Sequence, residues 1–447
     1  MAMDLSIRGG SVVLPDGVRV MDIGIEAGRI VALEESCGGA SDEIDASGLH
    51  VFPGVVDPHV HFNEPGRTEW EGFATGSAAL AVGGGTCFID MPLNSEPPLL
   101  DVDTFNAKRD AGFAASRTDF ALWGGLTPDS LDTMEALADA GVVGFKAFMC
   151  DSGVASFRRA DEVTLREGMH IAAQRGLPVA VHAEDEGTVR RQTDEVRSSG
   201  RSDWLAFLES RPVEAERAAV ETALALAADT GCKLHVVHVS HPSVIDIIHH
   251  ARETLQTDVT CETCPHYLTF TEEDLPRLGA IAKCAPPLRD VQAVSGLWSG
   301  LQEGRIDWVA SDHSPCPADM KQGGDAFGSW GGIAGVQSTF SVMLSHEPSL
   351  KLSKLASLTA DHAARRFGLA GKGRIALGFD ADLVLVDTAA RSTLTAEQLR
   401  DRHRLSPYVG KRFRGVMKRT LLRGQTIVEE GVTVGEAAGR FLAPGEG

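Results

Sequence analysis

Residues 54–66 read GVVDPHVHFNEPG, and this stretch decides the fold. The apolar run at its start is typical of a β-strand, and two histidines, His59 and His61, follow one residue apart. Alternate residues of an extended chain point to the same face, so both imidazole rings lie on one side. Ordinary surface or core histidines give the same pattern, so the rest of the chain must decide whether the pair binds a metal.

The composition is that of an ordinary globular protein with a large core. The chain has 447 residues, of which 43% are hydrophobic and 23% are charged. It carries 42 Lys and Arg residues against 62 Asp and Glu residues, which gives a formal net charge of −20. Nucleic acids and anionic membranes attract basic surfaces, so this balance argues against both as partners and favours a small-molecule substrate.

The sequence shows no signal for export or membrane insertion. The N-terminal segment MAMDLSIRGGSVVLPDG lacks the basic and apolar regions of a secretory peptide, and no run of 18 apolar residues occurs. Eight cysteines in 447 residues are too sparse for a disulfide framework. We therefore expect reduced thiols and a cytoplasmic protein.

Both ends of the chain are typical of short β-strands. Residues 4–50 alternate apolar and polar residues around Gly and Pro-Asp-Gly turns, and the tail from about residue 370 repeats this pattern. Neither end can bury a good core alone, so we expect the two to pair into one small β-sandwich. The predicted division is 1–52 and 369–447 for the sandwich and 53–368 for a central catalytic domain.

The central segment predicts a TIM barrel. Short apolar runs alternate with segments that carry apolar residues at helical spacing and often end on glycine. Eight β-then-α units in this order are the pattern of a (β/α)8 barrel, an α/β fold. The predicted strands are 50–57, 86–91, 119–125, 142–148, 177–183, 233–239, 258–263 and 306–312.

Residues that suit metal chemistry stand at the ends of five of these strands. In a TIM barrel the active site is built at the C-terminal ends of the strands. One histidine at the end of an apolar strand is more often a core residue, but independent core roles do not explain six such residues on one rim. The six candidates are His59, His61, Lys146, His182, His238 and Asp312.

These residue types favour a centre of one or two divalent ions. Imidazole and carboxylate ligands suit zinc above all, and also iron, cobalt or manganese. Lys146 is the unusual member, because a lysine among apolar residues is costly unless it is paired or chemically changed. An ammonium cannot ligate a cation, whereas a lysine carboxylated by carbon dioxide offers two oxygens that could bridge two metals.

Six motifs of the central segment resemble a known superfamily. They run from about residue 50 to about residue 340 and read DPHVHFNEPGRTEWEGFATGSAAL, GFKAFM, VHAED, HVSH, CETCPHYL and ASDHSP. These motifs resemble those of the cyclic amidohydrolases, and of the allantoinase family most closely. The flanks MDLSIRGGSVV and GFDADLVLVD resemble the composite β-sandwich of the same superfamily.

The resemblance implies a binuclear metal centre. His59 and His61 would hold the more buried ion. His182 and His238 would hold the more exposed ion, and Lys146, as its carboxylated form, would bridge the two. Relatives of this kind are commonly tetramers or dimers, so a homo-oligomer is also implied.

The implied reaction is metal-assisted hydrolysis of a cyclic amide. Asp312 would ligate the first ion and act as the general base toward the metal-bridging hydroxide. The allantoinase family implies that allantoin is opened to allantoate in purine catabolism. A single-metal site without the lysine modification stays an alternative.

Asn63 is the sharpest indication of the substrate ring. Dihydroorotase has an arginine at the matching position, which binds a substrate carboxylate, whereas an asparagine suits a neutral ureido or imide group. Asn94 matches a substrate-contacting asparagine of the family, although a plain turn residue fits its surroundings equally. Cys284 and Pro286, in CAPPLRD, lie where the backbone of relatives contacts the substrate ring.

Three other functions compete with this interpretation. The stretch FNEPGR after the histidine pair disfavours hydantoinase or dihydropyrimidinase activity, and Asn63 disfavours dihydroorotase activity. The superfamily also includes non-enzymatic scaffolds with the same barrel that lack metal ligands. Every ligand position is filled in this chain, which argues against a scaffold.

Two further segments carry weaker expectations. Residues 321–337 are rich in glycine and predict a loop that covers the substrate, with Asp319 and Lys321 solvated. Cys261 and Cys264 form a Cys-x-x-Cys motif without the second pair of a zinc ribbon, so we expect them to be structural. His266, which follows them, has no assigned role.

Overall fold

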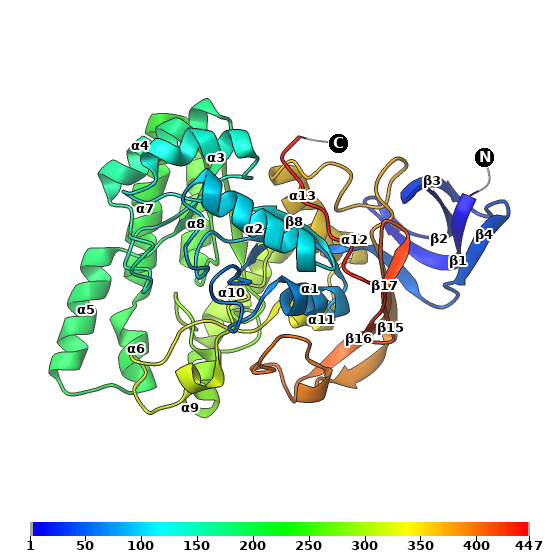
Figure 1. Ribbon diagram of the computed structural model, residues 1–447. Coiled ribbons are helices and arrows are strands. Elements are labelled where there is room, and N and C mark those ends of the chain that lie inside the picture. Colours follow the sequence, from blue (N-terminus) through cyan, green and yellow to red (C-terminus); the bar gives the residue numbers. More distant parts are fainter. Residues whose placement is uncertain (1–2, 446–447) are drawn as a thin grey trace.

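The computed structural model describes residues 3–445 and has two parts. A barrel of strands and helices lies beside a β-rich part that contains both chain ends (Figure 1). The α/β class, the TIM barrel and the joining of the two ends are therefore confirmed. No helix of these residues is long and apolar enough to span a bilayer.

Parallel strands form the barrel in two arcs, β6-β7-β8 and β9 to β14. β8 and β9 are two pieces of one stave that are separated by Trp123, whose indole donates a hydrogen bond to the Pro58 carbonyl (3.0 Å). A bridge between Val60 and His313 joins the first stave to the last. The strands are β6 (Val55–Val60), β7 (Gly85–Asp90), β8 (Asp119–Leu122), β9 (Gly124–Gly125), β10 (Phe145–Phe148), β11 (Pro178–His182), β12 (Lys233–Val236), β13 (Val259–Thr263) and β14 (Trp308–Val309).

Helices cover the outside of the barrel (Figure 1). They are α1 (Phe73–Val82), α2 (Val102–Ala115), α3 (Met134–Ala140), α4 (Glu162–Gln174), α5 (Glu186–Ser198), α6 (Trp204–Ser210), α7 (Val213–Thr230), α8 (Pro242–Thr254), α9 (Leu275–Leu278), α10 (Val291–Glu303), α11 (Thr339–Ser345), α12 (Leu352–Ala356) and α13 (His362–Arg366).

Aspartates fix the start of several of these helices. At each of these helix starts the N-cap carboxylate accepts a hydrogen bond from a backbone N–H three residues later, which satisfies a donor that the helix leaves free. The capping residues of α2, α4, α5, α6 and α10 are Asp101, Asp161, Asp185, Asp203 and Asp290.

The first predicted strand, 50–57, is divided in the structure. Residues His50–Pro53 form β5 of the terminal sheet, and only the part from Val55 belongs to the barrel. Gly54 lies at the crossing, where a Cβ atom would approach Thr86 Oγ1 to 2.2 Å. The prediction of one continuous strand is therefore wrong, because the chain changes sheets at a residue that only glycine fits.

Both chain ends contribute to one nine-stranded sheet, in the order β18-β17-β16-β15-β5-β1-β2-β3, with β4 beside β1. The ends meet where β5 pairs antiparallel with β15, with Pro53 opposite Leu383. The predicted domain limits at residues 52 and 368 stay predictions. The strands are β1 (Met3–Leu14), β2 (Gly17–Glu26), β3 (Arg29–Glu34), β4 (Ala40–Asp45), β15 (Leu383–Thr393), β16 (Arg412–Leu422), β17 (Gln425–Glu429) and β18 (Val432–Thr433).

Beyond β18 the chain returns to the barrel. The Leu442 amide donates to the Phe120 carbonyl (2.8 Å), and the Phe120 amide donates to the Arg440 carbonyl (2.9 Å). The last part of the predicted sandwich segment therefore contacts β8 of the barrel.

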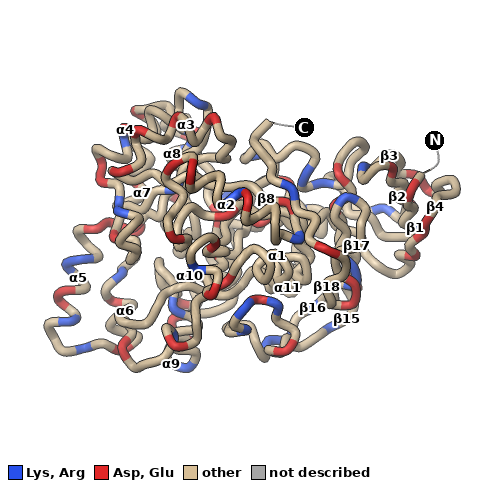
Figure 2. Tube along the Cα trace, viewed as in Figure 1, with Lys and Arg blue, Asp and Glu red and all other residues tan. Residues whose placement is uncertain are grey.

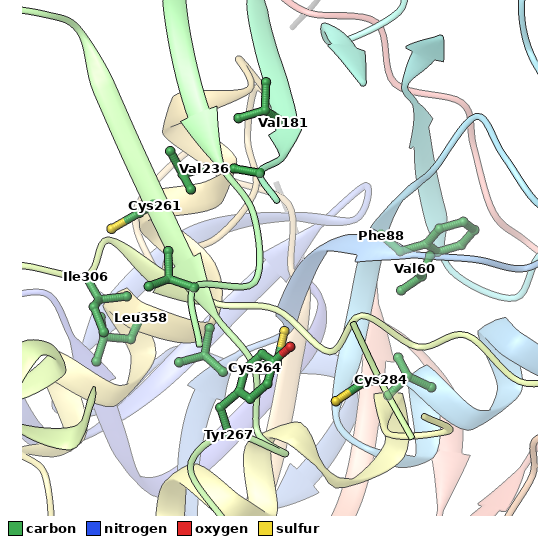
Figure 3. Close-up of a cluster of buried hydrophobic side chains, with 14 of the residues drawn as sticks. Val60, Phe88, Val181, Val236, Cys261, Cys264, Tyr267, Cys284, Ile306 and Leu358 are labelled. Carbon is green, nitrogen blue, oxygen red and sulfur yellow. The ribbon is translucent and has the colours of Figure 1, made fainter. Parts of the chain in front are cut away.

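Apolar side chains fill the barrel between its strands and helices. Figure 3 shows members of this core, among them Val60, Val181 and Val236, which are at most 1% exposed. Charged residues of both signs are interspersed over the outer helices and the terminal sheet (Figure 2). Because apolar side chains fill the interior, polar residues of the barrel gather at the carboxyl ends of its strands.

Candidate active site and metal centre

The six predicted ligand residues come together at the carboxyl ends of the barrel strands. They border one cavity of about 680 Å³. His59 lies in β6, Lys146 in β10 and His182 at the end of β11. His61 follows β6 directly, and His238 and Asp312 lie within three residues of the ends of β12 and β14.

Hydrogen bonds between the first and last staves place Asp312 opposite the His-x-His pair. The Asp57 carboxylate accepts hydrogen bonds from the backbone amides of Ser311 (3.1 Å) and His59 (3.2 Å). The His61 amide donates to the His313 carbonyl (2.8 Å). These bonds hold residues 311–313 against the end of β6, so the Asp312 side chain faces both histidines.

One group of ligand atoms is already clustered. His59 Nε2 lies 3.1 Å and His61 Nε2 lies 3.4 Å from Asp312 Oδ1. One ligand atom of each residue lies within 4.8 Å of the other two, which is the spacing of a metal site. His238 is close by, with its ring centroid 5.6 Å from that of His59 and 4.7 Å from that of His182.

Acidic residues behind the histidines determine which ring nitrogen is free. His59 Nδ1 lies 2.5 Å from Glu262, which also accepts from the Trp308 indole (2.7 Å) and faces His235 Nε2 at 3.1 Å. His59 Nδ1 therefore donates to Glu262, and Nε2 is the ring nitrogen that faces Asp312.

The same arrangement orients His182. Its Nε2 lies 2.7 Å from Glu184, and Arg211 donates a hydrogen bond to the same carboxylate (2.5 Å). Nε2 therefore carries the proton and Nδ1 keeps its lone pair. Burial opposes ionisation of Glu184, but Arg211 and His182 outweigh it and lower the pKa of this carboxyl to about 2.

Sequence reasoning missed Glu184, Glu262 and Arg211. Both glutamates stand inside motifs that the sequence does show, VHAED and CETCPHYL. Metal-binding histidines commonly donate their second N–H to a carboxylate, so an acid next to each ligand strand was the available signal. Arg211 follows α6 and gave no local signal, because only the fold brings it to Glu184.

The protonation states of His61, His182, His238 and Asp312 favour metal binding, whereas His59 must lose a proton first. Burial lowers the pKa of His61, His182 and His238, so these rings are neutral. Burial opposes ionisation of Asp312, but the facing histidines hold its pKa well below the usual range. Burial also acts to lower the pKa of His59, but its two carboxylate neighbours outweigh this effect and raise it to about 9.

Lys146 is buried without a partner. Its side chain is 1% exposed, and Nζ has no hydrogen-bond partner among residues 3–445. Burial lowers the pKa of this amine to about 7. An uncompensated ammonium is costly in such a place, so the neutral amine or a modified form suits the site.

Four residues at the site have positive φ angles although none is glycine. The values are 64° for Asn63, 64° for Asn94, 40° for His238 and 46° for Asp312. Such backbone conformations persist only where surrounding contacts impose them, and they concentrate at functional sites.

The predicted substrate contacts divide into two groups. Asn94 and Cys284 border the cavity, and Asn94 Nδ2 donates to Ser314 Oγ (3.3 Å). Asn63 and Pro286 are not among the residues that border it. Asn63 Nδ2 instead donates to the Pro315 carbonyl (3.4 Å), and the Pro286 carbonyl accepts from the Tyr267 hydroxyl (2.5 Å).

The glycine-rich loop forms part of the cavity wall, through residues 327–332. Asp319 is exposed, but the prediction that Lys321 is solvated is wrong. Its ammonium donates to the carbonyls of Ala280 (3.0 Å), Trp330 (3.0 Å) and Gly332 (2.6 Å). The lysine thus ties the loop to residues 279–282.

Comparison with known proteins agrees with this architecture. A model described as "Amidohydrolase family" matches residues 50–427. A protein named allantoinase from Solibacter usitatus is 53% identical over 98% of this chain and 96% of its own length. An allantoinase from Rubrobacter xylanophilus is 51% identical over 99% and 98% of the two chains.

The fold is shared with solved hydantoinase structures. The L-hydantoinase (dihydropyrimidinase) from Arthrobacter aurescens superposes with a TM-score of 0.96 and 33% identity, covering 99% of this chain and 100% of that one. The agreement therefore includes the terminal sheet as well as the barrel. The family model matches most of the chain, and the two relatives match it over nearly its whole length. The chain therefore belongs to the amidohydrolase family.

Proposed function

We propose that this protein hydrolyses the cyclic amide of allantoin to give allantoate, a step of purine catabolism. The observation that carries the proposal is full-length identity above 50% to two relatives named allantoinase. The convergence of six ligand-type residues on one cavity supports it independently.

We propose that the site holds two divalent ions, with zinc the first candidate and iron, cobalt and manganese the others. His59, His61 and Asp312 would hold one ion, and His182 and His238 the other. The neutral imidazoles of His61 and His238 and the ionised carboxylate fit such ions, and metal binding would displace the extra proton of His59. When bound, the pair would supply an acidified water and polarise the scissile carbonyl.

The bridge between the two positions would be Lys146 in carboxylated form. A neutral amine can attack carbon dioxide, which forms a nitrogen–carbon bond, releases one proton and leaves a carbamate with two oxygens. Burial lowers the lysine pKa to about 7, which makes the neutral amine available near neutral pH. The modification would also remove the cost of the unpartnered Nζ.

Asp312 would move the proton during ring opening. Its carboxylate lies at the edge of the cavity, with 14% of the side chain exposed, and stays ionised because histidines face it. It would take a proton from the attacking water and give it to the ring nitrogen that leaves. His59 and His61 fix its orientation through Oδ1.

The cavity suits an uncharged ring. Two of its cations are already engaged: Arg211 binds Glu184 (2.5 Å), and Lys283 donates to the Ser329 carbonyl (2.5 Å). A substrate carboxylate such as that of dihydroorotate calls for a free cation, which neither of these two side chains offers, although exposed Arg190 also borders the cavity. Asn94 and the backbone at Cys284 would contact the ring, while Asn63 and Pro286 would shape the wall behind it.

Hydantoinase activity is the second candidate, because an L-hydantoinase shares the fold over the whole chain at a TM-score of 0.96. The two functions separate in one experiment that compares ring opening of allantoin, hydantoin and dihydroorotate by the metal-supplemented protein. We expect kcat/KM for allantoin to exceed the other two by orders of magnitude. Faster opening of hydantoin would transfer the assignment to hydantoinase.

We further propose a cytoplasmic homo-oligomer, a dimer or a tetramer. All eight cysteines are free and buried, which suits a reducing compartment. Sedimentation equilibrium of the purified protein would give the assembly state. A monomer at micromolar concentration would contradict this part of the proposal.

A further inference from the structure

His266 is a buried polar residue that the proposed mechanism does not use. Its side chain is 1% exposed, and neither ring nitrogen has a hydrogen-bond partner among the residues that the structure describes. A neutral imidazole keeps a free lone pair on one of its two nitrogens, so this ring can serve as a metal ligand. Buried polar groups in proteins are nearly always paired, so this one calls for an explanation.

Two further ligand-type side chains lie next to this ring. A nitrogen of His266, the Cys264 sulfur and an Asp312 carboxylate oxygen lie within 4.8 Å of one another. Cys264 is 0% exposed and is not in a disulfide. Ligand atoms around a tetrahedral zinc ion are about 3.3–3.8 Å apart, so side-chain adjustments of about 1 Å would complete a site here.

The backbone fixes this arrangement. Cys264 and His266 follow β13, and the turn is closed by hydrogen bonds from the Tyr267 amide to the Cys264 carbonyl (3.1 Å) and from the Phe270 amide to the His266 carbonyl (2.9 Å). The Tyr267 hydroxyl is anchored on Pro286. Figure 3 shows Cys264 beside the Tyr267 ring, away from Cys261.

We propose that Cys264, His266 and Asp312 form an additional metal site, here called the thiol site, which shares Asp312 with the proposed catalytic centre and takes a thiophilic divalent ion when zinc is in excess. Sulfur and imidazole ligands suit zinc, cadmium and cobalt. Binding breaks the S–H bond of Cys264 and releases the proton to solvent, so the ion is held by a thiolate, an imidazole and a carboxylate.

An ion in the thiol site inhibits hydrolysis. Asp312 belongs both to this group and to the cluster with His59 and His61. A carboxylate bound to an additional cation no longer accepts a proton from water, so excess zinc lowers the rate. This inhibitory effect rests on the proposed function, whereas binding to the thiol site does not.

Cobalt spectroscopy tests binding directly. None of the six ligands of the proposed catalytic centre contains sulfur, so a sulfur-to-cobalt charge-transfer band in the near ultraviolet reports the thiol site alone. We expect the band when Co²⁺ is added to zinc-loaded protein. Cys264→Ser and Cys264→Ala should remove it, and His266→Gln should weaken Co²⁺ binding at least tenfold.

Cys261→Ser is the matched control. Cys261 lies in β13, three residues before Cys264, and is equally buried, but its sulfur contacts Arg252 and the Arg305 carbonyl instead. The band should persist in this variant. A band that survives both Cys264 substitutions, or no band in the wild type, would overturn the thiol site.

Zinc titration of activity tests the inhibitory effect. We expect excess zinc to inhibit the wild type and Cys261→Ser equally, and Cys264→Ser to need at least tenfold more zinc. Equal inhibition of Cys264→Ser and the wild type would overturn the inhibitory role. If no variant hydrolyses allantoin, the proposed function fails, while the cobalt band still decides whether the thiol site exists.

Discussion

Lys146 is the residue whose chemistry the account depends on most. Its replacement by alanine removes the proposed bridge, so allantoin hydrolysis should fall at least about 100-fold, the upper end for loss of an outer metal partner. Short carboxylic acids should restore part of the activity by supplying the two oxygens. Steady-state kinetics with and without acetate or propionate provide the measurement, and a fully active Lys146→Ala protein would disprove the bridge.

Glu184 should matter although it faces away from the substrate. Glu184→Gln keeps the shape but loses the charge that orients His182, so zinc affinity should fall about 10–100-fold. Competition with a chelator measures this affinity. Glu186→Gln is the matched control, because Glu186 accepts only a backbone hydrogen bond from Asp151 at the cavity mouth. Equal zinc affinity in the Glu184 variant and the wild type would contradict the orienting role.

Zinc affinity should rise with pH, because His59 must lose a proton to bind the ion. In the metal-free protein its pKa is raised to about 9, so its protonated form stabilises the fold below about pH 6.5, and this contribution is lost as pH rises through 9. Zinc must displace that proton, so affinity should rise about tenfold per pH unit between pH 7 and 9. Competition with a chelator measures the zinc affinity at each pH. An affinity that does not change between pH 7 and 9 would show that His59 is neutral in the metal-free protein.

At this scale the sequence predicts the ligands better than the substrate contacts. Strand-end position alone identified His182 and His238, because a barrel places such residues on one rim. The resemblance to relatives predicts that Asn63 contacts the substrate, and in the structure its amide donates to the Pro315 carbonyl. A left-handed backbone at residue 63 directs the side chain, and no sequence pattern reveals that.

Among the elements, the glycines of residues 321–337 predict a loop, but they do not predict how the loop is attached to the barrel. Lys321→Met removes three hydrogen bonds to carbonyls and should loosen the cavity wall. We expect KM for allantoin to rise several-fold with a smaller change in kcat, and faster amide exchange in residues 327–332. Lys351→Met is the control, because Lys351 is exposed. Equal amide exchange of residues 327–332 in the two variants would contradict the role of Lys321 in holding the loop.

The strands show the same limit of sequence reasoning. Apolar runs located every stave, whereas the division at Gly54 follows from contact with Thr86, which is distant in the sequence. Local composition predicts that a segment is extended. It does not predict which sheet the segment joins.

For the whole molecule, the joint between the barrel and the terminal sheet is a buried ion cluster. Lys372 Nζ lies 2.5 Å from Asp119, at the start of β8, and 2.7 Å from Asp382, before β15. Arg423 also contacts Asp119. Asp119 and Lys372 are 253 residues apart, so no local sequence pattern predicts their ion pair. The pairing of the two chain ends, in contrast, was predictable from the sequence.

Lys372→Met should therefore destabilise the fold without altering the site. It leaves buried carboxylates without their cation, which costs about 3–5 kcal/mol. Lys418→Met, which breaks the exposed pair with Glu430, should cost less than about 1 kcal/mol. Denaturant unfolding of the two variants gives the comparison, and equal losses would contradict a stabilising joint.

The central claim is that two divalent ions in this barrel open the allantoin ring. The most direct test is the rate of allantoin hydrolysis as zinc is added stepwise to metal-free protein in bicarbonate buffer. We expect no activity without metal and a plateau of the rate at two equivalents of zinc per chain. A plateau at one equivalent, or hydrolysis that persists in the presence of a strong chelator, would contradict it.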